Sequence, residues 1–119
     1  MVIFLCEDSV DGIFTGIYDA WASRLGHDCI ALRIHAPMDL ELFAEYRQVS
    51  ADAQKAEKVA RSIREKMGLD AYQTIYQAAL SKSPDRADHI YRVTLLGMSR
   101  HTPSEEARKV IWKLQDPHV

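Results

Sequence analysis

A strand, helix and strand pattern in the first 34 residues constrains the fold more than any other feature. An apolar run with two β-branched residues, Val2 to Cys6, predicts a buried strand. Asp8 or Ser9 follows as a helix N-cap, and a second apolar run, Cys29 to Ile34, predicts another strand. A strand, helix and strand in this order predict a right-handed β-α-β unit.

The intervening segment is expected to be a helix that buries one apolar stripe. Its apolar side chains recur at helical spacing, and Gly26 stands where a left-handed C-terminal cap belongs. Gly12 and Gly16 lie four residues apart inside this helix, where each costs up to ~1 kcal/mol relative to Ala. We therefore expect a neighbouring element to approach closely there. The stripe comprises Val10, Ile13, Phe14, Ile17, Trp21 and Leu25.

The rest of the chain predicts a short third strand and then helices only. Pro37 breaks the chain, residues 38–43 read as one helical turn or a covering loop, and Tyr46 to Ser50 is the third strand. Caps and apolar spacing predict four further helices. The first of these helices runs from Ser50 or Asp52 to Gly68. The second opens with an Asp70–Gln73 capping box and turns Tyr76 and Leu80 inward. The third begins at Pro84, and the fourth runs from Pro103 to Asp116.

These elements predict an α+β fold. A β-α-β layer over residues 1–50 packs against four helices in residues 51–119. With 119 residues, 47% of them hydrophobic and 27% charged, the chain suits a single domain with its own core. We therefore expect one domain over residues 1–119 rather than two.

Charge is distributed unevenly along the chain. The net charge is -2, which argues against a protein that coats nucleic acid by bulk charge. Residues 1–49 carry -5 and residues 50–119 carry +3, so the helical half is the better candidate for contacting phosphates. The alternative is a solvated surface laced with pairs such as Glu57–Arg61 and Glu105–Lys109. The candidate contact residues are Lys58, Arg61, Arg64, Arg100, Arg108, Lys109 and Lys113.

The sequence contains no recognisable catalytic motif. Asp8 and Asp11 follow the first strand, where α/β folds often bind ligands, but their charge suits a helix cap better than a phosphate site. His89 could act as a general base, although no partner for it is apparent, and Asp88 and Arg92 read as an i,i+4 ion pair. The sequence therefore favours a chain without catalytic activity.

Metal sites and membrane segments are not predicted. Cys6, His27 and Cys29 lack the spacing of a metal motif, so neither a metal nor another cofactor is expected. The N-terminus lacks the features of a signal peptide, and no apolar window is long enough to span a membrane. The expected location is the cytoplasm, with reduced thiols.

Several segments resemble one bacterial family, the "probable DNA metabolism proteins". The most specific is Cys6–Thr15, which continues through Ile17–Trp21. Further similarity lies in Glu45–Val49, Lys55–Ala60 and Ala78–Ser81, so the resemblance spans most of the chain. That family has no known biochemical activity; it is associated with a radical-SAM protein of DNA repair or modification, and some members are fused to a uracil-DNA-glycosylase-like domain.

The resemblance implies an accessory role in DNA metabolism, with a radical-SAM protein as partner and DNA as a second candidate partner. It supplies no catalytic residue, and any iron–sulfur chemistry would belong to the partner, since two cysteines cannot hold a four-thiolate cluster. Family members continue past Asp116–Val119 into a segment rich in His, Arg and aromatic residues, so the resemblance implies that this segment is missing here. The alternatives are a protein-interaction module that docks through the apolar face of the last helix (Val110, Ile111, Leu114), or a small enzyme using the strand-end acids or His89.

Overall fold

The structure, a computed structural model, describes residues 1–34 and 44–100. Three strands and four α-helices make up this part of the chain, which confirms the α+β class. The helix expected from Pro103 and the turn or loop expected over 38–43 lie outside the described residues. In chain order the elements are β1 (Val2–Leu5), α1 (Val10–Ala22), a 3₁₀ turn (His27–Cys29), β2 (Ile30–Arg33), β3 (Glu45–Gln48), α2 (Ala53–Met67), α3 (Leu69–Leu80) and α4 (Arg86–Arg100).

The three strands form one parallel sheet in the order β2-β1-β3. Val2 of β1 is paired with Ile30 of β2 on one side and with Glu45 of β3 on the other. The β1-α1-β2 segment is the predicted β-α-β unit. The third strand is almost entirely exposed, so the sheet buries chiefly the apolar side chains of its first two strands.

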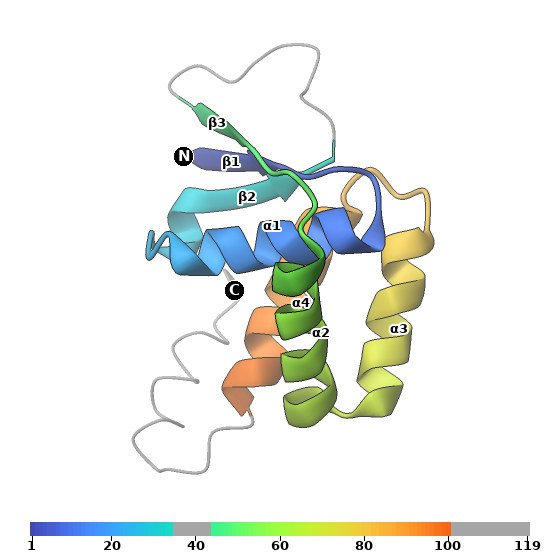
Figure 1. The fold of residues 1–119 in the computed structure, drawn as a ribbon. Coiled ribbons are helices and arrows are strands. Elements are labelled where there is room, and N and C mark those ends of the chain that lie inside the picture. The colour runs from blue at the N-terminus through green and yellow to red at the C-terminus, as the bar shows by residue number, and fades with distance from the viewer. Residues whose placement is uncertain (35–43, 101–119) are drawn as a thin grey trace.

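Helix α1 is the middle layer of the molecule. Figure 1 shows the three strands at the top and α1 directly beneath them, with α2 and α3 below α1, whereas α4 packs against α2, α3 and also β2. All six residues from Gly12 to Ile17 are buried. A helix that is buried all round needs apolar or small side chains on every face, not along one stripe only. The expected single stripe was therefore too narrow for this part of α1.

The two glycines of α1 explain how closely it approaches the residues that follow the first strand. A Cβ atom on Gly12 would lie 2.3 Å from the backbone oxygen of Glu7, and one on Gly16 would lie 2.3 Å from the Sγ atom of Cys6. Neither distance is possible without a shift of the backbone or of a buried thiol. The close approach predicted from the i,i+4 glycines is confirmed.

Thr15 joins α1 to the start of α2 on its other side. Its hydroxyl accepts a hydrogen bond from the Asp52 N–H at 3.0 Å and is also within 2.6 Å of the Asp11 carbonyl oxygen. The Asp52 carboxylate in turn accepts from the N–H groups of Gln54 and Lys55, as an N-cap does. This fixes where α2 begins against α1.

Helix α3 is less buried than its apolar spacing predicts. Only Ile75 and Ala79 of this helix are buried, whereas Tyr76 and Leu80 are exposed, so their inward prediction was wrong. The Asp70 capping box was wrong too. Gly68, at φ +96°, ends α2 and starts α3 at the next residue, so no side chain caps α3.

Asp88 and Arg92 of α4 form hydrogen bonds with backbone groups at the outer edge of the sheet. The Leu32 N–H donates to the Asp88 carboxylate at 3.0 Å, and the Arg92 guanidinium donates to the carbonyl oxygens of Ile30 and His27. The expected ion pair between Asp88 and Arg92 is present at 3.6 Å. These side chains therefore occupy backbone groups that an exposed edge strand would offer to another chain. Within residues 1–34 and 44–100, no helix is long and apolar enough to cross a membrane.

Candidate nucleic-acid interface

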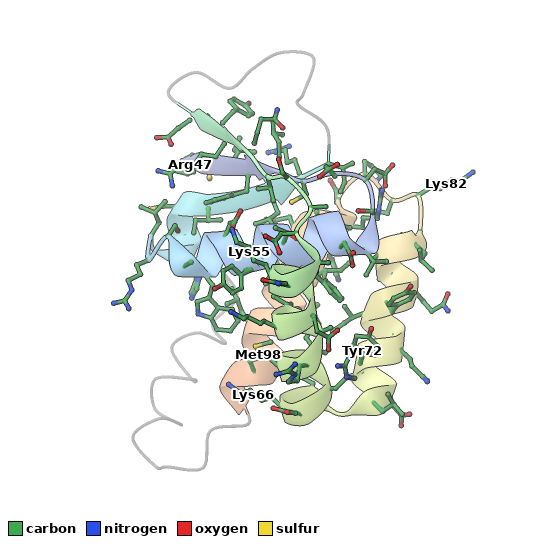
Figure 2. All side chains as sticks on the ribbon, in the orientation of Figure 1. Arg47, Lys55, Lys66, Tyr72, Lys82 and Met98 are labelled. Carbon is green, nitrogen blue, oxygen red and sulfur yellow. The ribbon has the colours of Figure 1, made fainter. Side chains whose placement is uncertain are left out.

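A groove of about 750 Å³ lies where the C-terminal end of α1 meets α2 and the end of α4. Lys66 and Met98, both labelled in Figure 2, mark its α2 and α4 sides. Its volume falls within the range of small-ligand sites in proteins. The groove is lined by Tyr18, Trp21, Ala22, Arg24, Leu25, His27, Lys58, Val59, Ser62, Lys66 and Met98.

The charged side chains along this groove are all cationic. Arg24, Lys58 and Lys66 are exposed, and no described Asp or Glu lines it. Lys58, Ser62 and Lys66 follow one another at intervals of four residues, which places them on one side of α2. At 1.5 Å per residue, the two lysines are about 12 Å apart along the helix axis. The groove therefore offers positive charge along its length.

Two aromatic side chains stand beside these cations. The Tyr18 ring has the Lys55 and Lys58 ammonium groups at 5.5 and 5.8 Å from its centroid. Lys55 is held there by an ion pair with Asp19 at 3.0 Å, which also raises the pKa of Lys55. Trp21 is 42% exposed, so its predicted place in the buried stripe was wrong. The α2 residues that line the same groove are Lys58, Ser62 and Lys66, together with the buried Val59.

The backbone at Arg24 is in the left-handed region. Arg24 has a φ of +59°, whereas Gly26, where the left-handed cap was expected, has a φ of -64°. The left-handed conformation costs an L-residue other than Gly roughly 1–2 kcal/mol. A charged residue thus holds a conformation that suits glycine while its side chain lines the groove. Such strain often marks a functional position.

We expect Arg24→Gly to stabilise the fold and to remove one positive charge from the groove. Removing the strained conformation should raise the free energy of unfolding by about 0.5–1 kcal/mol, after the greater freedom of glycine in the unfolded chain is subtracted. Loss of the cation would weaken severalfold any binding of phosphates in the groove. Urea unfolding and oligonucleotide titration measure the two effects. Arg24→Ala is the control: it loses the charge but keeps the strain. A Gly variant no more stable than the Ala variant would contradict this account.

His27 closes one end of the groove against α4. Its Nδ1 atom is hydrogen-bonded to the hydroxyl of Tyr91 at 2.9 Å. Partial burial, and then the nearby Arg92 charge, lower the pKa of His27. Burial raises the pKa of Tyr91 to about 12, so its hydroxyl is neutral at pH 7. The imidazole of His27 is therefore mainly neutral, and its hydrogen bond to Tyr91 links the groove to the core.

The basic residues predicted to contact nucleic acid are not gathered in one place. Lys58 lines the groove, but Arg61 does not. Arg64 faces α3: it pairs with Glu57 at 2.8 Å and lies 5.0 Å from the Tyr72 ring centroid. The pair expected between Glu57 and Arg61 is thus made by Arg64 instead. Arg108, Lys109 and Lys113 lie outside the described residues, as does the Arg100 side chain.

Asp8 and His89 line a second cavity, of about 1000 Å³, between the end of the first strand and α4. The Asp8 carboxylate accepts from Arg86, a buried guanidinium that also donates to the Ser83 carbonyl at 2.8 Å. Within the described residues the imidazole of His89 makes no hydrogen bond. Asp11 lies in the first turn of α1 and does not line this cavity. The geometry thus gives Asp8 a role in anchoring α4.

The two cysteines differ in exposure. Burial, and then the Asp19 charge, raise the pKa of Cys6 to about 12, so its thiol stays protonated. Cys29 is exposed. Across residues 1–34 and 44–100, no three His, Cys, Asp or Glu side chains lie together in a way that could hold a metal ion.

Comparisons with protein-family models, curated proteins and solved structures each found no match.

Several groove residues were not identified from the sequence: Tyr18, Trp21, Arg24 and Lys66. One signal for part of the set was present, because the spacing of Lys58, Ser62 and Lys66 places three polar residues on one side of a predicted helix. Nothing in the sequence indicated that α1 and α4 would meet at that side.

Proposed function

We propose that this protein is a non-catalytic accessory protein of DNA metabolism that contacts DNA through the groove between α1 and α2. The observation that carries the proposal is the composition of the groove: three exposed cations and two aromatic rings, with no acidic side chain among the described lining residues. Proteins that bind nucleic acid strands combine cations along a groove with aromatic side chains. The resemblance to a DNA metabolism family points to DNA as the nucleic acid.

Local charge matters more here than the net charge of -2. Phosphates respond to cations within about a Debye length, roughly 8–10 Å in ordinary salt. Lys58 and Lys66 are about 12 Å apart along the helix axis, with Arg24 contributed by the end of α1. A backbone lying in the groove would therefore meet the positive charges of Lys58, Lys66 and Arg24.

Salt dependence of DNA binding tests the proposal. With three cations replacing counterions on a single strand, the slope of log affinity against log salt should be about -2. Affinity should then fall roughly 20-fold between about 50 and 200 mM salt. Fluorescence anisotropy with labelled single-stranded and duplex oligonucleotides measures this. Failure of both DNA forms to bind at 50 mM salt would refute the proposal.

The resemblance adds a radical-SAM enzyme of DNA repair or modification as partner. Co-expression of the two proteins followed by size-exclusion chromatography tests that part separately. We expect co-elution, and separate elution at micromolar concentrations would count against a stable complex.

A further inference from the structure

We infer that the groove takes single-stranded rather than duplex DNA, with an unstacked base lying on the indole of Trp21. This rests on the proposed function and specifies which form of DNA the site recognises. The indole is 42% exposed at the mouth of a cationic groove. Exposing the large apolar ring of Trp to water is unfavourable in free energy. Burying one face of the ring against a base removes part of that unfavourable exposure.

Trp21 is better placed for stacking than Tyr18. The Tyr18 ring already has two ammonium groups, those of Lys55 and Lys58, within 6 Å of its centroid. Lys55 is held in place by Asp19, so at least this contact is fixed before any ligand arrives. No cation–π partner is seen for Trp21 among the described residues. We therefore assign the stacking of a base to Trp21. Tyr18 instead supports the cations beside it.

The exposed indole favours a single strand over a duplex. In duplex DNA the bases are stacked on one another inside a stiff cylinder, so an indole at the mouth of the groove cannot reach a base face without unstacking the duplex. A single strand can turn its bases outward while its phosphates follow the cations. Base–aromatic stacking of this kind is sequence-tolerant, because every base has a π-face.

The floor of the groove suits a base as well. Val59 and Met98 are buried beneath the polar rim and present apolar surface, while Ser62 and His27 supply hydrogen-bonding groups at its edge. An aromatic face, an apolar floor and a few polar groups are the usual composition of a site for a heterocyclic ring. The cations along α2 then contact the phosphates of the DNA strand.

The test uses the full 119-residue chain with Trp112→Phe, so that Trp21 is the sole tryptophan. The probes are a thymidine oligonucleotide of about 12 nucleotides, within the usual site sizes, its duplex with the complementary strand, and free thymidine monophosphate. Binding is followed at 50 mM salt by tryptophan quenching and by anisotropy of labelled DNA. In the same background, Trp21→Ala, Trp21→Phe and Tyr76→Ala are compared by anisotropy. Tyr76 is the matched control, since it is 39% exposed but lies on α3 outside the groove.

We expect the single strand to bind at least tenfold more tightly than the duplex and to quench Trp21. Trp21→Ala should lose about 5- to 150-fold in affinity, the range for one stacked base, whereas Trp21→Phe and Tyr76→Ala should stay within about threefold. Equal binding of both DNA forms, an unaffected Trp21→Ala variant, or equal affinity for the free nucleotide would overturn this inference and leave the proposed function standing. No binding of any DNA would remove the proposed function itself.

Discussion

Arg92→Ala is expected to lower the free energy of unfolding by about 2–4 kcal/mol. The guanidinium donates to two backbone carbonyls, those of His27 and Ile30, and pairs with Asp88. Hydrogen bonds from a charged donor contribute about 1.5–3 kcal/mol each, and their loss leaves both carbonyls and the carboxylate without this partner. Urea unfolding followed by circular dichroism measures the change.

Two further variants separate the sheet-edge role of Arg92 from a general effect of charge. Arg92→Lys keeps the charge but not the forked geometry, so its loss should be intermediate. Arg61→Ala removes an exposed arginine from α2 and should change stability by less than about 0.5 kcal/mol. The Arg92→Ala protein should also associate more readily, because the edge of β2 is uncovered. A stability loss equal to that of the Arg61 control would mean that α4 does not hold the sheet edge in this way.

Reversing two charges in the groove should weaken DNA binding about 100-fold. Lys58→Glu combined with Lys66→Glu replaces two attractive contacts by two repulsive ones, at roughly tenfold in affinity for each. The fold should persist, since both lysines are exposed. Anisotropy with the thymidine oligonucleotide at 50 mM salt measures the effect.

Lys82 provides the matched control for this experiment. It extends from the connection between α3 and α4, well away from Lys66, as Figure 2 shows. Lys82→Glu is compared with the single variant Lys66→Glu: both change the net charge equally, so only position distinguishes them. Affinity losses of similar size would indicate a response to total charge and would contradict binding in the groove.

The class of the fold follows from sequence because short-range signals dominate it. The β-branched run at the N-terminus, the cap at Ser9 and the break at Gly68 each act on neighbouring residues, and the structure has strands and helices where they predict them. The prediction of a capping box at Asp70 was wrong, and the reason is again local. The turn at Gly68 brings the start of the next helix forward, before Asp70 can cap it.

The candidate site was harder to predict because it depends on packing between distant segments. Periodicity puts Trp21 in an apolar stripe, but the structure leaves it 42% exposed beside a groove to which α2 contributes Lys58, Val59, Ser62 and Lys66. The same limit applies to Arg24. A left-handed residue was expected at Gly26, and the structure has it two residues earlier, at Arg24.

The central claim is that DNA lies in the groove between α1 and α2, and amide chemical-shift mapping tests it most directly. Isotope-labelled protein is titrated with the unlabelled thymidine oligonucleotide. We predict that the largest shifts occur at Tyr18, the Trp21 indole N–H, Lys58 and Ser62, with little change along α3. Shifts concentrated instead around the second cavity, at Asp85 to Val93, or no shifts at saturating DNA, would contradict the account.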